Sequence, residues 1–399
     1  MSALAAVNAA FTARFHTPPA LVVRAPGRVN LIGEHTDYND GFVMPLAIDR
    51  WVWIALRPRA DRHVCAASLE LEESAQFDLA ALQRGGHGWS EYVKGTAWAL
   101  LQAGYRLRGF DAILSGDVPI GAGLSSSAAL ELATARALAA AADLPWAPAQ
   151  MARLAQMAEN EWVGVRCGIM DQMASAGGRE GHALLIDCRS LEMTPVPLPR
   201  DVSVLVLDTT TRRGLVDSAY NERRAQCEQA ARLLDVPALR DIDASALPRL
   251  AASTAGTGGA GQPALDPVVL RRARHVVTEN ARALRAAAAL RAGDVREVGR
   301  MLDESHVSLR DDFEVSSPAL DAMVESAHRA PGCLGARMTG AGFGGCVVAL
   351  VTSTEHDRFV AEVERSYTRE TGFTPKLYTC HASNGAEIVW GAPSPATHA

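Results

Sequence analysis

GDVPIGAGLSSSAALELATARALAAA, residues 116–141, joins a glycine-rich loop and three consecutive serines to an Ala/Leu-rich helical segment. Gly121 and Gly123 allow backbone conformations and close approaches that a side chain would prevent. A helix N-terminus has unpaired N–H groups and about +0.5 charge, so it favours an anion such as phosphate. Three serines exceed what one helix cap requires. The residues predicted to hold a phosphate are Gly121, Ala122, Gly123, Leu124, Ser125, Ser126 and Ser127.

The spacing of this loop excludes two common nucleotide-binding motifs. A Walker A loop needs a lysine after its last glycine, and none is present here. The dinucleotide fingerprint needs a third glycine where G-A-G-L-S-S has a serine. On spacing alone, a capped helix behind a glycine turn explains the loop about as well as a phosphate site does.

A second stretch, GRVNLIGEHTDYNDG (residues 27–41), gathers an arginine, a glutamate, a histidine, two aspartates and a tyrosine around one apolar pair. These polar residues follow neither the helical nor the strand period, so a solvated amphipathic face does not account for them. Asn39, Asp40 and Gly41 have the chemistry of a turn into the next strand. By itself, E-H-T-D fits a surface loop better than a binding site.

Composition indicates a large soluble enzyme. At roughly 150 residues per domain, 399 residues predict two or three domains. A net charge of −6 without a basic stripe argues against nucleic-acid binding. No apolar run approaches the ~20 residues that span a bilayer, and no signal peptide is recognisable. Seven cysteines without metal-like spacing favour a reducing, cytoplasmic setting.

Periodicity and turn residues predict a mixed α/β chain with a boundary near residue 200, at the Pro-rich VPLPR. Helices are expected over 4–15, 91–104, from the glycine loop to about 142, and over 148–162, 217–234, 268–291, 294–309, 318–329 and 355–369. Strands are expected over 21–23, 42–56, 111–119, 182–188, 202–210, 333–338, 346–351 and 375–380. The low-complexity segment 251–266 reads as a flexible surface insertion, and deleting Thr254–Gly261 within it should leave activity unchanged.

Three motifs carry a resemblance to a known family. PIGAGLSSSAAL resembles the phosphate loop of the GHMP kinases, a superfamily of small-molecule kinases. GARMTGAGFGGCVVAL (residues 335–350) is similar to the third motif of that superfamily, a second glycine loop near the nucleotide. GRVNLIGEHTDYNDG resembles the signature of the galactokinases within it. The motifs occur in the family's order and span most of the chain.

The resemblance implies an α+β fold with two lobes and the active site in the cleft between them. Residues 1–200 would form a lobe with a mixed sheet and helices, and residues 201–399 a lobe with an antiparallel sheet and helices. The extreme C-terminus could pack back on the first lobe. The implied activity is transfer of a phosphoryl group from ATP, with Mg²⁺, to the C1 hydroxyl of galactose. We expect a monomer, or at most a weak homodimer, with no nucleic-acid or membrane partner.

The resemblance also assigns the reacting groups. Asp171, in the apolar run VGVRCGIMDQMAS, matches the carboxylate that takes the proton of the sugar hydroxyl. From the sequence alone, a helix N-cap explains Asp171 equally well. Arg28 matches the arginine beside that base, where a guanidinium stabilises charge that develops during transfer. Whether Asp171 removes the proton or only positions the hydroxyl is left open.

Further residues are assigned to the sugar and to the metal by the same resemblance. Carboxylates and histidine suit sugar hydroxyls, because they accept or donate several hydrogen bonds. Mg²⁺ prefers hard oxygen ligands and keeps several waters, so one or two protein oxygens suffice. The implied metal ligands are Ser127 and Glu159. The implied sugar-binding residues are Glu34, His35, Thr36, Asp37, Gly168 and Tyr220.

Weaker assignments complete the prediction. The glycines of the third motif (Gly340, Gly342, Gly344 and Gly345) are expected to pack against the phosphate loop, although strand-connecting turns would also need them. Trp89 is expected near the adenine. His63, His87 and His381 show no partner pattern. A sister kinase for N-acetylgalactosamine or arabinose, and a non-catalytic sugar sensor with the same fold, are the alternative functions.

Overall fold

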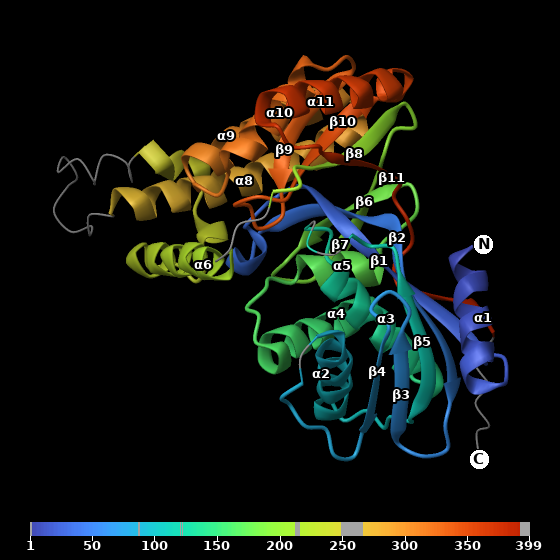
Figure 1. Ribbon diagram of the computed structural model, residues 1–399. Coiled ribbons are helices and arrows are strands. Elements are labelled where there is room, and N and C mark those ends of the chain that lie inside the picture. Colours follow the sequence, from blue (N-terminus) through green and yellow to red (C-terminus); the bar gives the residue numbers. More distant parts are fainter. Residues whose placement is uncertain are drawn as a thin grey trace.

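Two β-sheets organise the chain in the computed structural model, one in each lobe (Figure 1). The structure describes residues 2–86, 88–119, 121, 123–211, 216–248 and 266–391. The predictions for Ala122, for His87 and for nearly all of the 251–266 insertion therefore lie outside the described residues. None of the described helices is long and apolar enough to cross a bilayer.

The sheet of the N-terminal lobe has the strand order β12-β1-β2-β5-β3-β4, and β2 also pairs with the β6–β7 hairpin. All of its pairs are antiparallel except β3 with β5. The last strand of the chain thus joins the edge of the first lobe, next to β1 (Figure 1). Its strands are β1 (Leu21–Ile32), β2 (Phe42–Pro58), β3 (His63–Ser68), β4 (Glu73–Asp78), β5 (Phe110–Gly116), β6 (His182–Asp187), β7 (Glu192–Pro197) and β12 (Glu387–Trp390).

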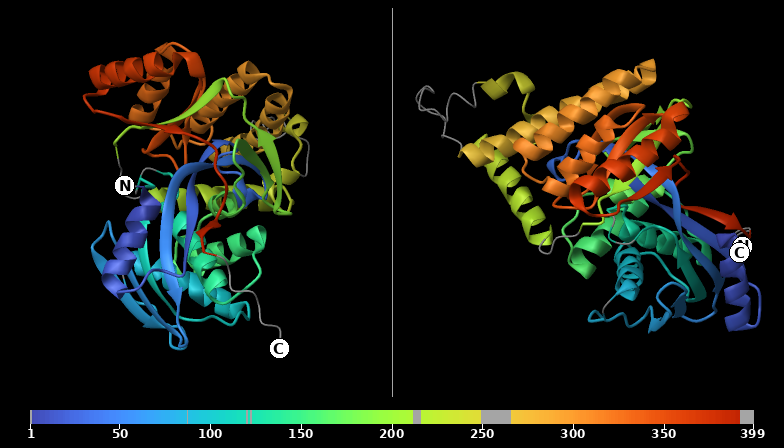
Figure 2. Two further views of the ribbon diagram at one scale, coloured as in Figure 1. Left: turned by 90° about the vertical axis from the view of Figure 1, so that its right-hand side faces the viewer. Right: turned by 45° about the horizontal axis from the view of Figure 1, so that its top comes forward.

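Helices cover both faces of this sheet (Figures 1 and 2). On one face, α1 (Ala3–Phe15) buries Val7 and Phe11 against Trp51 and Trp53. The opposite face carries the helices that position the candidate site, and their apolar sides form the main core of the lobe. These are α2 (Trp89–Gln102), α3 (Ser126–Ala141), α4 (Pro148–Met157) with the π-helical turn Ala158–Val163, and α5 (Met170–Gly177).

The C-terminal lobe is an antiparallel sheet, in the order β11-β8-β10-β9, packed between helices. Successive residues of β8 point to opposite faces, as the strand period requires. Leu205 and Leu207 enter the core of this lobe, whereas Val204 and Val206 enter a core that includes Val29 from β1. The elements are β8 (Val202–Asp208), β9 (Cys333–Thr339), β10 (Cys346–Thr352), β11 (Lys376–Cys380), α6 (Val216–Leu233), α8 (Pro267–Ala292), α9 (Val295–Asp311), α10 (Pro318–Arg329) and α11 (His356–Thr371).

The structure corrects several predicted elements. The strand predicted over 21–23 continues to Ile32, because it pairs with β2 along its length, with register shifts near Pro26 and Asn30. The helix predicted over 148–162 changes to π-helical geometry at Ala158. Helix α5 was not predicted, and its N-cap is Ile169, so Asp171 lies inside the first turn rather than at the cap. Four short strands, β3, β4, β7 and β12, were also missed.

Candidate active site

A paired arginine and aspartate lie where three segments converge. Arg28, on β1, donates from Nε to Asp171 Oδ1 at 2.7 Å and from Nη2 to Oδ2 at 2.6 Å. Its third nitrogen, Nη1, donates to the carbonyl of Gly123 at 2.6 Å. Burial lowers the pKa of Arg28, but the carboxylates of Asp171, Glu34 and Asp37 together outweigh burial, so the arginine pKa is raised. The guanidinium therefore joins the carboxylate to the glycine–serine loop, residues 121–127.

The glycine–serine loop has the backbone shape that the sequence predicts. Gly121 and Gly123 both have φ of +73°, a conformation that other residues rarely adopt. Helix α3 begins at Ser126, and its N-terminal N–H groups face the loop. Ser125 does not cap the helix with its side chain; its hydroxyl donates to Asp171 Oδ2. This explains why the loop carries more serines than a cap needs.

The third glycine motif lies against this loop. A Cβ atom built on Gly340 would come within 3.8 Å of the Gly123 carbonyl oxygen. From the same motif, Gly340 N donates to Glu34 Oε2 at 3.1 Å. The turn after β9 thus contacts both the glycine–serine loop and the 27–41 motif.

An apolar cavity opens beside the start of α3. Its volume is about 370 Å³, and Ser126 and Ser127 form part of its wall. Trp89 belongs to this wall, and its indole N–H is held by Glu73 Oε2 at 3.1 Å. We call it the apolar cavity; its apolar walls are Val52, Leu71, Trp89, Tyr92, Leu114, Val118 and Leu130. The flat apolar walls and the adjoining helix N-terminus suit a nucleotide base and its phosphates.

A second, polar cavity of about 210 Å³ lies between the lobes. It adjoins the first, because its wall residue Asp171 is bonded to Ser125, next to Ser126 of the apolar cavity. We call it the polar cavity; its lining residues are Arg28, Glu34, His35, Asp37, Glu159, Val165, Arg166, Cys167, Gly168, Met170, Asp171, Tyr220, Gly340 and Ala341. The sequence-predicted residues Glu34, His35, Asp37, Gly168 and Tyr220 therefore meet in one place.

His35 and Asp37 enter the polar cavity in unusual protonation environments. Burial lowers the pKa of His35 to about 3, so its ring is neutral at physiological pH. His35 Nδ1 bonds the Tyr38 hydroxyl at 2.9 Å, and Nε2 has no partner of good geometry among the described residues. Burial and the neighbouring Asp171 raise the pKa of Asp37 to about 6. Both side chains retain capacity for hydrogen bonds to a ligand.

Gly168 is needed for space at this site. A Cβ atom built there would lie 1.7 Å from Asp37 Oδ2, which no structure tolerates without displacing the carboxylate. Tyr220 packs its ring 5.6 Å from His35 and 5.5 Å from Tyr38. Thr36 does not line the cavity: its hydroxyl lies 2.8 Å from the carbonyl oxygens of both Gly33 and Phe42 and can donate to either. Thr36 thus holds the turn that presents its neighbours.

Glu159 belongs to a buried polar cluster behind Asp171. Its Oε2 accepts from Gln172 Nε2 at 2.6 Å and from Cys167 Sγ at 3.3 Å, and Ser127 also bonds the carboxylate. Burial, with Asp171 second, raises the pKa of Glu159. Gln172 Nε2 also donates to Glu131 Oε2 at 3.2 Å. Neither Gln172 nor Glu131 could be predicted from the sequence, because an internal helix position carries no motif signal.

The donors here fit a magnesium ion. The Ser127 hydroxyl and the Glu159 carboxylate are hard oxygen donors, and they lie together where the two cavities adjoin. Two carboxylates, Glu159 and Asp171, face the polar cavity, and a divalent cation would offset their repulsion. No group of three or more His, Cys, Asp and Glu side chains forms a metal cage within the described ranges. Mg²⁺ needs no such cage when substrate phosphates and water complete its shell.

Three regions of the chain match known family descriptions. Residues 9–58 match the galactokinase galactose-binding signature, residues 91–179 match the GHMP kinases N terminal domain, and residues 286–369 match the GHMP kinases C terminal. The first match covers β1, the 27–41 motif and β2, and the second covers the glycine–serine loop, Glu159 and Asp171. The matched regions thus contain most of the side chains that line the two cavities.

Full-length relatives and solved structures agree with these matches. The galactokinase of Roseiflexus sp. (strain RS-1) is 47% identical over 95% of both chains, and that of Chloroflexus aggregans is 47% identical over 98% of this chain and 99% of the relative. The crystal structure of Lactococcus lactis galactokinase complexed with galactose aligns with a TM-score of 0.89 and 35% identity, over 97% of this chain and 100% of that one. A mevalonate kinase structure, at 19% identity and a TM-score of 0.62, shares the fold. This chain, with its two-lobed α+β architecture, belongs to the galactokinase family of the GHMP kinases.

Proposed function

We propose that this chain transfers the γ-phosphoryl group of ATP to the C1 hydroxyl of α-D-galactose, giving galactose 1-phosphate and ADP. One observation carries the proposal: the Ser125–Asp171 hydrogen bond connects the loop beside Ser126, in the wall of the apolar cavity, to the polar cavity, where Arg28 is bonded to Asp171. Such a junction brings a nucleotide phosphate and a sugar hydroxyl together, which supplies most of what phosphoryl transfer requires.

In this proposal Asp171 receives the proton of the C1 hydroxyl while the hydroxyl oxygen forms its bond to the γ-phosphorus. The bond from the γ-phosphorus to the bridging oxygen of ADP breaks at the same time, and ADP departs. Arg28 holds both carboxylate oxygens in a fork, so the carboxylate cannot rotate. Oδ2 accepts from both Arg28 and Ser125, whereas Oδ1 accepts from Arg28 alone and retains a lone pair that can accept the proton.

The same arginine serves the phosphoryl side. Arg28 Nη1 bonds the Gly123 carbonyl, which fixes the guanidinium against the glycine–serine loop. There it stabilises negative charge that develops on the transferring group. Ser127 and Glu159 would hold Mg²⁺, which when bound neutralises phosphate charge and orients the phosphate oxygens. Gln172 keeps the Glu159 carboxylate in place from the other side.

In the polar cavity, Glu34, His35, Asp37 and Tyr220 would bind the sugar hydroxyls. Each is at least partly buried, so an acceptor that leaves one of them unpaired loses that hydrogen bond and incurs a desolvation penalty. We therefore expect galactose, with its axial 4-hydroxyl, to be preferred over glucose. The cavity is small, about 210 Å³, which disfavours an added N-acetyl group.

The proposal is tested by ADP release with galactose, glucose, N-acetylgalactosamine and arabinose as acceptors. We expect galactose to give the highest kcat/KM and glucose to be lower by about 10²-fold or more. A higher kcat/KM with N-acetylgalactosamine or arabinose would assign the chain to a sister kinase. Galactose binding without any ADP release would assign it to a non-catalytic sensor, although the catalytic aspartate and the serines of the loop are present.

We also propose that the protein works as a monomer in the reducing cytoplasm. All seven cysteines are free thiols, and none is paired in a disulfide. Sedimentation at micromolar protein concentration, with and without reductant, tests this proposal. A stable dimer, or a change of state on removing the reductant, would contradict it.

A further inference from the structure

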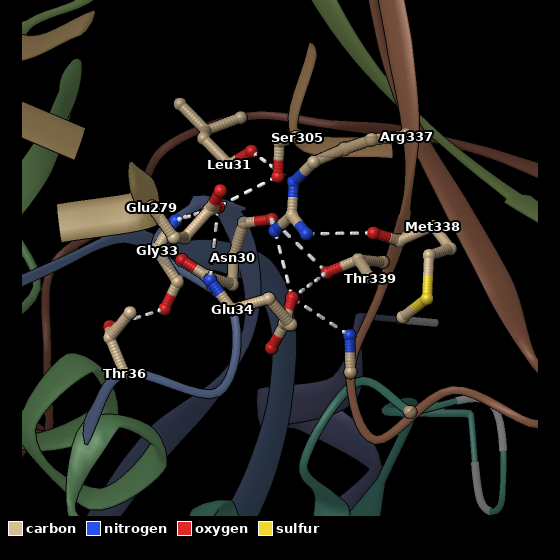
Figure 3. Close-up of polar contacts among 12 residues, drawn as sticks. Asn30, Leu31, Gly33, Glu34, Thr36, Glu279, Ser305, Arg337, Met338 and Thr339 are labelled. Atoms are coloured by element: carbon tan, nitrogen blue, oxygen red, sulfur yellow. Dashed lines mark hydrogen bonds and ion pairs between the residues drawn. The ribbon is translucent and has the colours of Figure 1, made fainter. Parts of the chain in front are cut away.

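Arg337, on β9, is a fully buried arginine at the junction of the two lobes (Figure 3). Its Nε donates to the Leu31 carbonyl at 2.6 Å, and its Nη2 donates to the Asn30 carbonyl at 2.7 Å. Both carbonyls belong to β1 of the other lobe. The same Nη2 forms an ion pair with Glu34 Oε2 at 2.8 Å. One side chain of the C-terminal lobe thus holds the strand end and the carboxylate that face the polar cavity.

The two carboxylate oxygens of Glu34 differ in their hydrogen bonds. Its Oε2 accepts from Arg337, from Gly340 N at 3.1 Å and from Thr339 Oγ1 at 3.4 Å (Figure 3). Oε1 has no hydrogen bond within the described part of the chain, although Glu34 lines the polar cavity. The protein therefore fixes one oxygen and leaves the other for a ligand.

Burying a charged carboxylate is costly unless an opposite charge is paired with it. Only 4% of the Glu34 side chain is exposed, and Arg337 is its ion-pair partner. The planar fork of an arginine can bond two β1 carbonyls and a carboxylate simultaneously, whereas a lysine ammonium cannot reproduce that geometry. The orientation of Glu34 thus depends on a guanidinium that does not itself line the polar cavity.

We propose that Arg337 is a positioning residue that determines sugar specificity: from the C-terminal lobe it holds Glu34 Oε2 and so directs Oε1 into the polar cavity, where Oε1 accepts a hydrogen bond from one sugar hydroxyl. This inference rests on the proposed phosphorylation of a sugar in that cavity. Arg337 does not bond the glycine–serine loop in the described residues, so its effect falls on the acceptor rather than on the nucleotide.

Arg337→Lys tests the proposal, with Arg272→Lys as the matched control. Arg272 is also a deeply buried arginine of the C-terminal lobe, but it bonds Gln226 and Glu314 instead of the cavity residues. We expect Arg337→Lys to raise the galactose KM about tenfold or more while the ATP KM changes less than about twofold, since one lost charged hydrogen bond is worth about that factor. The control should leave both KM values unchanged.

A panel of monodeoxygalactoses separates positioning from general damage. In the wild type, the deoxy sugar that lacks the hydroxyl bound by Glu34 should have a higher KM than galactose. In Arg337→Lys and in Glu34→Gln the KM of that deoxy sugar should lie within about threefold of the galactose KM. An equal rise of the galactose and ATP KM values, or an unchanged ratio of the deoxy-sugar KM to the galactose KM, would overturn the proposal. Failure of the wild-type protein to phosphorylate any sugar would instead overturn the proposed function.

Should Arg337→Lys fail to fold, Thr339→Val provides a milder change. It removes only the hydroxyl that reaches Glu34 Oε2 and the Asn30 carbonyl. A rise of the galactose KM by about twofold to fivefold at constant ATP KM supports the proposal. An unchanged galactose KM contradicts it.

Discussion

The two cavities of the site differ in what their walls offer. The apolar cavity has about 370 Å³ of space, and aromatic and aliphatic side chains such as Trp89, Tyr92 and Leu130 predominate in its walls. The polar cavity has about 210 Å³ and is lined by ionisable groups, among them Arg28, Glu34 and Asp171. Contact area and stacking act in the first cavity, whereas paired hydrogen bonds act in the second. Substitutions in the apolar cavity should therefore weaken binding gradually, whereas substitutions in the polar cavity should cause large losses of activity.

The polar groups differ from the apolar walls also in how they are held. Asp171 is fixed by Arg28, Glu34 by Arg337, and His35 by Tyr38. Groups fixed in this way do not reorient to suit another ligand, so on the proposed function the discrimination between sugars is set before binding. Apolar walls impose no comparable requirement on direction.

Asp171→Asn removes the proposed base from the polar cavity and should have the largest effect. The amide cannot take the hydroxyl proton, so we expect kcat to fall by about 10²–10⁴-fold. Galactose and ATP binding should persist, because neither cavity loses volume. Steady-state kinetics and calorimetric titration with galactose measure both effects. A kcat close to that of the wild type would refute the role of Asp171 as base.

Gly168→Ala tests how little space the polar cavity can lose. The added Cβ would meet Asp37 Oδ2 at 1.7 Å, so the carboxylate must move. Overpacking costs about 1–3 kcal/mol, which predicts a decrease in the kcat/KM for galactose of about 10–10²-fold. The ATP KM should be unchanged, and the melting temperature is measured alongside. Equal losses for both substrates would show a general distortion instead.

Trp89→Ala removes an aromatic side chain from the wall of the apolar cavity. Losing a flat aromatic wall should raise the ATP KM about tenfold, while the galactose KM and kcat change little. Trp98→Ala, on the same helix α2 but outside the cavity, is the matched control. If Trp89→Ala raised the galactose KM instead, the base would have to bind elsewhere.

Acid pH should affect the polar cavity before it affects the fold. Burial raises the pKa of Asp37 from 3.8 to about 6, so the carboxylate gains a proton as pH falls through 6. Protonated Asp37 loses acceptor capacity, and the kcat/KM for galactose should decrease up to about tenfold by pH 5. Because the folded pKa is raised, this group opposes stability above pH 4 and ceases to do so on acidification. A profile that is flat to pH 5, or that changes only with unfolding, contradicts the assignment; Asp37→Asn should remove the inflection.

Several parts of the site could be predicted because their chemistry is contiguous in sequence. The 27–41 motif and the glycine–serine loop each carry their polar atoms in one run, and the loop positions with positive φ are recognisable because they are occupied by Gly121 and Gly123. Long helices such as α8 and α10 also agree with their predicted ranges to within one residue. Local sequence patterns thus predicted the motifs and helices whose residues are contiguous in the chain.

The remaining parts depend on contacts that no local pattern shows. In the sequence Arg337 looks like any other strand arginine. Its role depends on two carbonyl partners that lie 306 and 307 residues away along the chain. Glu279, on α8, accepts from Gly33 N at 3.0 Å and so holds the same strand end, yet it reads as an ordinary helical glutamate (Figure 3). Strand β12 is short, and its pairing with β1 spans the whole chain. Such features follow from tertiary packing rather than from propensity.

The central claim, that the polar cavity presents the C1 hydroxyl of galactose to a nucleotide phosphate, is tested most directly by the identity of the product. We would incubate the full-length protein with ATP, MgCl₂ and galactose and record ³¹P and ¹H spectra of the reaction mixture. The account predicts ADP and a single sugar phosphate esterified at C1 in the α configuration. A phosphate at the 6-hydroxyl, or ADP with inorganic phosphate and no sugar ester, would contradict it.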